Sequence, residues 1–397
     1  MLTVGATPSL VQVQSVPDAP TVTSTVALPG SFGTGSISRP VMIGTRAVLT
    51  SRGNDFVTSP DDRLFVIEGI GTATLTVKTV FVPGLAAGEP SIPVELTPTS
   101  LLITTAGFDS LFGTGDEVLT LVAALDTAAP TVTSLFVGRI RGDASGRALA
   151  SGGTIAAVAT SGLDATFATI DDSLQVVRDV LVFPSPAPPL VVGPLASGDN
   201  GRPVSTGGDA AVIPTLGIDL LQGTVDDQVA AVFPLSIDPM IATPLFAPRG
   251  TTGLKGALVP ISGSAVARIE AGLDGLMGTT DDGVRCFSFL NSAAPAAFAI
   301  TTGPLQSFAP MPISASSLAL CGLGFDQLAG TDDDVTIRIS GVGSSPSAAS
   351  NPTGPFAPLE IPVLVPGATS PSVAARTSGP DAAPGTADDR LTVAASP

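Results

Sequence analysis

The 397-residue chain contains no histidine, no tryptophan and no tyrosine. The side chains that most often move protons in active sites near neutral pH are therefore missing. Paired carboxylates can still hydrolyse glycosides, but that chemistry needs one differentiated pair in a cleft. No nucleophile elbow, phosphate-binding loop or dinucleotide fingerprint occurs in a strand-turn-helix setting. This inventory predicts a protein that is not an enzyme.

Lysine and aromatic rings are equally scarce. The chain has two lysines, Lys78 and Lys255, and phenylalanine is its only aromatic residue type. Nucleic-acid binding needs a basic stripe with stacking aromatic side chains. A sugar-binding platform likewise needs exposed aromatic rings. Both classes of partner are disfavoured.

Cysteines and long apolar runs are also few. Cys286 and Cys321 occupy different positions of the repeat described below, and we expect both to be buried as small apolar residues. A disulfide between them would require their strands to be neighbours. Four prolines interrupt the uncharged stretch from Cys286 to Phe325, so no membrane span is predicted. A basic start followed by an apolar core is missing, so no signal peptide is predicted.

The chain does contain an acidic loop that recurs seven times, as in GLDGLMGTTDD from Gly272. The copies occupy residues 53–62, 107–117, 162–172, 217–227, 272–282, 324–334 and 379–389. Their final acidic residues are 55 residues apart, except for one interval of 52. So regular a period marks a repeat protein, in which each unit buries its apolar faces against its neighbours. We therefore predict one repeat domain over residues 1–397.

Each repeat contains four short runs that are typical of β-strands. An apolar run such as VLTLV follows each acidic loop, a second run often ends in Val-Pro-Gly, and the third and fourth form a hairpin around a small-residue turn, as in RALASGGTIAAVATSG. No segment has the capped, amphipathic pattern of a long helix. The runs alternate poorly with polar residues, which predicts strands that are covered on both faces.

Seven such units predict an all-β fold, a seven-bladed β-propeller with four-stranded antiparallel blades. The alternative is a linear β-solenoid or repeat array, which closes no ring. The segment from Ser9 aligns without gaps on the segment from Arg63, so the chain has eight first strands but seven of each other type. One terminal strand can complete the blade made from the other end. The remaining strand is then spare and could pair with another chain in a self-assembling filament or surface array.

Negative charge is concentrated in the loops. The formal net charge is −17, from 34 acidic and 17 basic residues, and each of the seven loops carries at least three acids. Outside the loops, basic residues outnumber acidic ones. Carboxylates gathered in turns repel each other unless cations or backbone donors compensate them. Because a plain turn rarely needs three acids in every copy, this concentration favours a bound cation.

The loop pattern predicts calcium sites. Calcium takes six to eight oxygen ligands from carboxylates, carbonyls and water in a loop bent by glycine, whereas the lack of histidine disfavours zinc. The candidate ligands are Asp109, Asp116, Glu117, Asp164, Asp171, Asp172, Asp219, Thr224, Asp226, Asp227, Asp274, Thr279, Asp281, Asp282, Asp326, Thr331, Asp333, Asp334, Asp381, Thr386, Asp388 and Asp389. The first copy has Thr58 and Ser59 where others have Gly-Thr, and the third has Ala168 for glycine. We expect those two copies to bind poorly.

A turn without an ion is the alternative. Asp and Thr side chains accept hydrogen bonds from nearby backbone N–H groups, and glycine allows positive φ angles. The loop broadly resembles the acidic loops of calcium-binding repeat families such as the FG-GAP propellers of integrin type, although it lacks the FG-GAP signature. That resemblance implies a calcium-binding propeller.

Together these features predict a non-catalytic structural or binding module, extracellular or on a cell surface, with calcium as its cofactor. Its partners would be proteins or further copies of itself. A propeller enzyme with a site in the central channel is the rival class, and a unique polar cluster there would support it.

Overall fold

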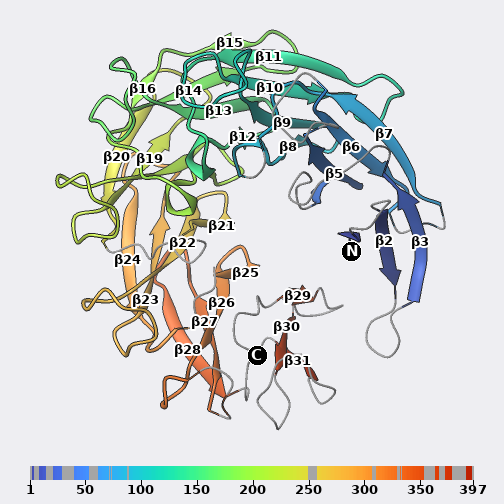
Figure 1. The fold of residues 1–397 in the computed structure, drawn as a ribbon. Coiled ribbons are helices and arrows are strands. Elements are labelled where there is room, and N and C mark those ends of the chain that lie inside the picture. Colours follow the sequence, from blue (N-terminus) through green and yellow to red (C-terminus); the bar gives the residue numbers. More distant parts are fainter. Residues whose placement is uncertain are drawn as a thin grey trace. The chain divides into compact units, whose positions relative to one another are not determined.

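The computed structural model of the chain describes residues 2–3, 9–14, 21–28, 40–52, 61–70, 72, 74–86, 89–248, 257–305, 310–328, 331, 333–352, 363–365, 372–377 and 390–395. Only the backbone is described for the strands before Leu28 and after Ser350. The chain divides into two compact units: Met1–Phe167 with Asp171–Pro189, and Ala168–Ile170 with Leu190–Pro397. Each unit is built from antiparallel sheets (Figure 1).

The first unit contains two four-stranded sheets and a third whose strands follow the same order. Their strands are β4 (Val41–Ile43), β5 (Arg46–Ser51), β6 (Arg63–Glu68) and β7 (Thr76–Phe81); β8 (Val94–Thr97), β9 (Ser100–Thr105), β10 (Val118–Ala123) and β11 (Thr131–Val137); β12 (Leu149–Ser151), β13 (Ile155–Thr160), β14 (Ser173–Arg178) and β15 (Ser185–Pro186). A three-stranded sheet of β1 (Leu2–Thr3), β2 (Ser9–Gln14) and β3 (Thr21–Ala27) precedes them.

The second unit contains three four-stranded sheets. Their strands are β17 (Val204–Ser205), β18 (Ala211–Thr215), β19 (Gln228–Phe233) and β20 (Ile241–Phe246); β21 (Val259–Ser262), β22 (Ala265–Glu270), β23 (Gly283–Ser288) and β24 (Ala296–Thr301); β25 (Met311–Ser314), β26 (Ser317–Gly322), β27 (Val335–Ser340) and β28 (Ser347–Pro352). The short strand β16 (Leu190–Val191) precedes them, and a three-stranded sheet of β29 (Val363–Val365), β30 (Ser372–Thr377) and β31 (Arg390–Ala395) follows.

The all-β prediction is confirmed, with several four-stranded antiparallel sheets. The helices in the described residues are single 3-10 turns, η1 (Glu89–Ser91), η2 (Ala144–Gly146) and η3 (Asp199–Gly201). Strands within each four-stranded sheet pair in chain order, and the expected hairpin of the third and fourth runs exists, for example as β12 and β13. Each sheet therefore takes its first two strands from one repeat and its last two from the next. The acidic loop joins the two middle strands.

Both faces of the sheets carry apolar side chains, as the sequence predicts. In the β8–β11 sheet, Leu101 and Ile103 pack with the β4–β7 sheet, whereas the alternate residue Leu102 packs with the β12–β15 sheet. Successive residues of a strand point to opposite faces, so a strand buried on both sides needs apolar residues at consecutive positions. Full burial of each such side chain is worth about 1.5–3 kcal/mol.

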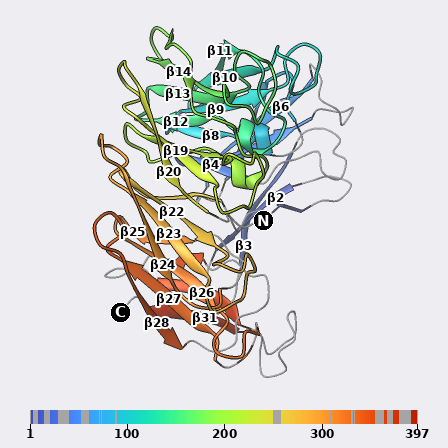
Figure 2. The ribbon, with the colours of Figure 1, turned by 90° about the vertical axis from the view of Figure 1, so that its left-hand side faces the viewer.

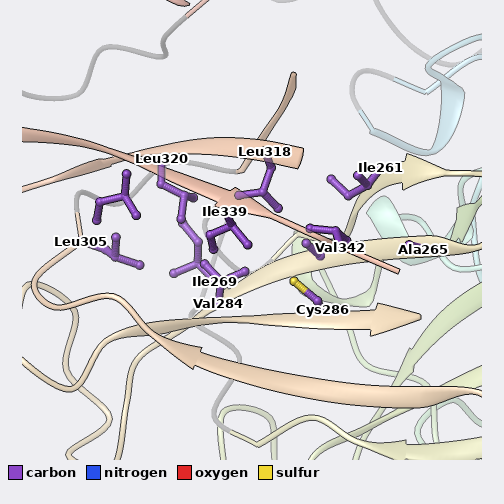
Figure 3. Close-up of a cluster of buried hydrophobic side chains, with 12 residues drawn as sticks. Ile261, Ala265, Ile269, Val284, Cys286, Leu305, Leu318, Leu320, Ile339 and Val342 are labelled. Carbon is purple, nitrogen blue, oxygen red and sulfur yellow. The ribbon is translucent and has the colours of Figure 1, made fainter. Parts of the chain in front are cut away.

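The same packing occurs in the second unit. Figure 2 shows strands β22–β24 beside strands β26–β28, and the two sheets share one apolar cluster. In Figure 3, Ile269 and Val284 of the first sheet face Leu320 and Ile339 of the second. All four side chains are buried. Face-to-face stacking of sheets is therefore the packing principle within each unit.

The edge strands with which successive sheets begin also contact each other. Strand β4 contacts β8 and β8 contacts β12 in the first unit, while β17, β21, β25 and β29 form a similar series in the second. Each sheet thus has one edge strand beside its equivalents in neighbouring sheets of the same unit. In each four-stranded sheet, the acidic loop joins the second strand from this edge to the third.

The terminal strands were expected to share one blade. Seven predicted runs follow the acidic loops, and the run from Ser9 aligns with them. All eight are strands: β2, β6, β10, β14, β19, β23, β27 and β31. However, the hydrogen-bonding order places β2 and β31 in two separate three-stranded sheets. Strand β2 pairs with β1 on one side and with β3 on the other. In the described strands, β2 is the middle strand of its sheet rather than an unpaired edge.

The two cysteines are buried and free. Cys286 lies in the apolar cluster between the β21–β24 and β25–β28 sheets, near Val342 (Figure 3). Leu318 and Leu320 of β26 belong to the same cluster, so Cys321, the next residue along β26, points to the other face of its sheet. Burial raises the pKa of both thiols to about 12. The cysteines are small core residues, and the disulfide considered from the sequence is not formed.

Candidate functional site in the acidic loops

Five acidic loops are described wholly or in large part. They join β9 to β10, β13 to β14, β18 to β19, β22 to β23 and β26 to β27. Of the first copy, Asp61 and Asp62 are described. The predicted ligands of the seventh copy, Asp381, Thr386, Asp388 and Asp389, lie outside the described residues. The three acids of a loop have three different environments.

The first acid of each loop makes a local turn. Its Oδ1 accepts a hydrogen bond from the backbone N–H two residues later, at 2.7–2.8 Å in all five loops. This is the Asx-turn geometry that aspartate favours. These residues, Asp109, Asp164, Asp219, Asp274 and Asp326, are exposed to solvent. The first acid therefore shapes the loop tip and remains in contact with water.

The second acid closes the loop on itself. The Oδ2 of Asp281 accepts hydrogen bonds from the N–H groups of Leu273 and Asp274, and its Oδ1 accepts one from the Thr279 hydroxyl at 2.8 Å. Asp116, Asp226 and Asp333 accept the equivalent threonine bond, and Asp116, Asp171, Asp226 and Asp333 accept the equivalent bond from the N–H of the first acid. The threonine bond is the main cause that lowers the pKa of Asp226, Asp281 and Asp333. These three carboxylates therefore stay ionised near neutral pH.

The third acid is buried. Asp62, Glu117, Asp172, Asp227, Asp282 and Asp334 are at most 4% exposed. The Oδ2 of Asp282 accepts hydrogen bonds from the N–H groups of Gly278 at 2.7 Å, Thr279 at 3.1 Å and Leu305 at 3.0 Å. Leu305 follows the outer strand of the same sheet, so this carboxylate joins the loop to the segment leading to the next sheet.

Other copies repeat this connection. Glu117 accepts a hydrogen bond from the N–H of Ile140 at 3.2 Å, and Asp62 accepts one from Leu85 at 2.7 Å. Each of these donors lies 23 residues after its acid, as Leu305 does. The backbone carbonyl of the third acid is used as well: that of Asp282 accepts from Thr302 N–H at 2.9 Å. In these copies the third acid therefore links the loop to the chain segment that leads to the next sheet.

Burial has an electrostatic cost at this position. It is the main cause that raises the pKa of Asp227 and Asp282, against the hydrogen bonds that lower it. The Oδ1 atoms of Asp227 and Asp282 are also buried and accept no hydrogen bond from the residues that the structure describes. A buried carboxylate oxygen without a donor loses its hydration with no replacement.

The structure separates most of the predicted ligands by role. The hydroxyls of Thr224, Thr279 and Thr331 serve the second acid of their own loops. Within the described part of the chain, no three acidic, histidine or cysteine side chains are grouped so that they could hold a metal ion. Backbone N–H groups and threonine hydroxyls donate hydrogen bonds to the second and third acids, as in a turn that needs no ion.

The degenerate third copy keeps the loop conformation. Ala168 replaces the central glycine but has a φ of 65°, close to the positive φ of Gly223 and Gly278. Asp164 and Asp171 retain their backbone hydrogen bonds. Replacement of the central glycine by alanine therefore leaves these turn contacts in place.

One repeated feature of the loops has no counterpart among the residues predicted from the sequence. The residue after the opening glycine is apolar and 85–99% exposed in all five described copies: Phe108, Leu163, Ile218, Leu273 and Phe325. A second exposed leucine occurs three residues later in four of them: Leu111, Leu221, Leu276 and Leu328. The sequence carries this signal as an apolar residue directly after the opening glycine of each of these loops.

A cavity of about 310 Å³ lies in the second unit between the fourth and fifth loops. The residues that line it include the apolar Val225, Phe246 and Leu273 and the acidic Glu270 and Asp281. Arg285 also lines it, and its Nε donates to Glu270 Oε1 at 2.5 Å. The cavity is at the lower end of the usual size of small-molecule sites.

Comparison with known proteins gives no family. No protein-family model matches the chain, and no curated protein sequence is similar to it. Among the described residues, no helix is long and apolar enough to cross a membrane.

Several solved structures are similar at low identity. The β-propeller domain of the Trilobed protease from Pyrococcus furiosus, described as having an open velcro topology, is 10% identical with a TM-score of 0.45, over 90% of this chain and 92% of that one. A putative TolB from Agrobacterium tumefaciens is 12% identical with a TM-score of 0.33, over 99% and 100%. The subtype N11 neuraminidase-like protein of A/flat-faced bat/Peru/033/2010 (H18N11) is 8% identical with a TM-score of 0.30, over 90% and 97%. All three TM-scores are below 0.5.

Proposed function

We propose that the protein is a non-catalytic seven-bladed β-propeller that serves as a structural or binding module. One observation carries the proposal: the third acid of each described loop is buried and, in the first, second and fifth copies, hydrogen-bonds the segment leading to the next sheet. Charged groups at these positions build the scaffold. The same role in three copies is unlike an active site, where one cluster differs from the others.

The sheets themselves support the propeller. Four-stranded meanders that stack face to face, with their first strands adjacent, are how propeller blades are arranged. From β4 onward, seven strands occupy the position that β4 has in its sheet: β4, β8, β12, β17, β21, β25 and β29. A seventh blade would form if the β29–β31 sheet accepted an outer strand from the start of the chain.

Substitution of single loop acids tests the scaffold role. Replacing Asp282 with alanine removes the acceptor of three backbone N–H groups, and we expect it to lower the free energy of unfolding by about 2–3 kcal/mol. The matched control is Asp274→Ala in the same loop, which removes one exposed hydrogen bond and should cost less than about 1 kcal/mol. Urea unfolding measures both. Equal losses in the two variants would contradict the structural role.

Calcium binding is the second candidate. It is favoured by the buried Oδ1 atoms of Asp227 and Asp282, which accept no hydrogen bond from the described residues. A divalent cation beside such an oxygen would replace its lost hydration, with water and backbone carbonyls as further ligands. An extracellular or cell-surface location belongs to the same proposal, because weak calcium sites fill only where calcium is abundant.

Thermal unfolding with and without calcium tests this candidate. Ligand that binds only the folded state stabilises it by about 2.7 kcal/mol at 100 times its Kd, so the Tm should be higher in millimolar calcium than in chelator. The double variant Asp274→Ala with Asp282→Ala should lose one bound ion and keep the others, since interactions in repeat proteins are local. An unchanged Tm, with no metal found by elemental analysis, would leave the loops as turns only.

A further inference from the structure

In the five described loops, the exposed apolar residue takes part in the loop's hydrogen bonds through its backbone and not through its side chain. In four loops its backbone N–H donates to the second acid: Phe108 to Asp116, Leu163 to Asp171, Leu273 to Asp281 and Phe325 to Asp333. Any residue type except proline supplies that N–H. The side chains of Phe108, Leu273 and Phe325 extend into solvent. The loop therefore does not account for an apolar residue at this position.

At one loop the apolar side chain borders a concave surface. Leu273 lines the 310 Å³ cavity together with Val225 of the preceding loop and Phe246 of β20. All three side chains are more than half exposed, at 53–85%. Apolar surface that is gathered around a cavity and open to water is typical of an interaction site.

The charges around the cavity are unbalanced. Glu270 is paired with Arg285 at 2.5 Å and with the buried Arg268 at 3.6 Å, and the carboxylate of Asp227 also attracts the charge of Arg268. Arg285 lies over the ring of Phe246, with its Cζ 5.7 Å from the ring centroid. The hydrogen bonds that Asp281 accepts come from neutral donors, two backbone N–H groups and one hydroxyl. Asp274 is exposed in the same loop. The unpaired charge at this cavity is therefore negative, which complements a cation.

We propose that this cavity docks a segment of a partner protein in which apolar side chains alternate with lysine or arginine. An apolar side chain of the partner would enter between Val225 and Leu273, and its basic neighbour would lie against Asp274 and Asp281. The inference rests on the proposed binding role and names the partner chemistry. A bilayer fits less well, because it would contact only the loop tips and anionic lipids would be repelled by the loop carboxylates.

Labelled peptides test the proposal with the full chain. A short peptide that alternates leucine with lysine should bind in fluorescence anisotropy, whereas peptides alternating leucine with glutamate, or serine with lysine, should not. The affinity should fall as salt is raised, because exposed charges are screened. Leu273→Ser should weaken binding about tenfold, the effect of losing roughly 1.4 kcal/mol of apolar contact.

Leu276→Ser is the matched control, since Leu276 is an exposed leucine of the same loop that does not line the cavity. It should leave the affinity unchanged. Equal weakening by both variants, equal binding of the leucine–glutamate peptide, or no binding of the leucine–lysine peptide would overturn the proposal. Sedimentation with phosphatidylcholine and phosphatidylserine vesicles in place of peptide binding would assign the surface to membranes instead. Urea unfolding of Asp282→Ala stands apart from these results, so failure of the scaffold role is distinguishable from failure of this inference.

Discussion

Two residues, Gly272 and Asp281, close the fifth loop. Gly272 has a φ of 45°, and a Cβ at this position would overlap the backbone carbonyl and carboxylate of Asp281. The opening glycines of the other described loops face the same close approach of the second acid. A glycine therefore opens each described copy because the second acid folds back over it. Asp282 then holds the closed loop to the rest of the sheet.

A pair of glycine substitutions tests this residue-scale explanation. Gly272→Ala should reduce the free energy of unfolding by about 1–3 kcal/mol, because the methyl group overpacks against Asp281. Gly275→Ala is the matched control: its φ of 72° is also positive, but nothing lies within 4 Å of the added Cβ. Ala165 already has a φ of 58° at the equivalent position of the third loop.

Urea unfolding of the two glycine variants measures the difference. We expect Gly275→Ala to remain close to the wild type. If the two variants were equally destabilised, backbone strain rather than overlap would explain the glycines.

At the scale of elements, one ionic cluster joins the strands of a sheet and reaches the next. Glu68 of β6 accepts hydrogen bonds from Arg46 of β5 and Lys78 of β7, both at 2.9 Å. Lys78 Nζ also donates to the carbonyls of Leu125 and Thr127, which follow β10 in the neighbouring sheet. Burial raises the pKa of Glu68, but the hydrogen bonds and charges of Lys78 and Arg46 outweigh it and lower that pKa below its ordinary 4.5.

This cluster predicts a pH-dependent contribution to stability. Because the folded-state pKa of Glu68 is lowered, its ionised form stabilises the fold above pH 4.5 and the contribution disappears as the pH falls through and below that value. Glu68 is partly exposed, so the contribution is small, about 0.5–1 kcal/mol. Glu68→Gln should therefore be less stable than the wild type near neutral pH and equally stable in acid.

Urea unfolding across this pH range compares Glu68→Gln with Glu95→Gln. Glu95 is an exposed residue of β8 in the same unit. A stability difference for Glu68→Gln that persisted in acid would show that packing, not charge, is lost in that variant.

For the whole molecule, the pairing of the terminal strands decides how the stacked sheets end. The sequence count of eight first strands is matched by eight strands, but β2 and β31 belong to different three-stranded sheets. A ring requires one sheet to take strands from both ends. A filament instead requires that these strands pair with another chain.

Small-angle scattering tests the ring. We expect a compact, disc-like particle with the mass of one chain, because a closed ring leaves few sheet edges open. An elongated rod of monomer mass would support the solenoid. A mass of several chains that falls to one when residues 1–16 are deleted would support self-assembly through the terminal strand.

Much of the fold could be predicted from the sequence because its determinants are local and repeated. Apolar residues at consecutive positions, as in Leu101, Leu102 and Ile103, indicate a strand that is covered on both faces. The 55-residue period and the glycine-rich turns place four strands in each repeat. The buried state of Cys286 and Cys321 was expected for the same reason, since both lie within apolar strands.

The candidate site could be predicted only in part. The sequence shows three acids per loop but does not distinguish the solvent-exposed Asp274 from the buried Asp282. Nor does it distinguish the exposed Leu273 from the apolar residues of the core. A leucine can be exposed or buried, and only its neighbours in the folded chain decide which.

The sequence alone therefore determined the repeat, the all-β class and the position of the acidic loops, because period and strand pattern depend on neighbouring residues. Tertiary structure decided what each acid does. The role of Asp282 depends on Leu305, which lies 23 residues later and is brought to it only when the outer strand β24 folds against β23. Hydrogen bonds between segments so far apart follow from sheet packing, and no local pattern of residues specifies them.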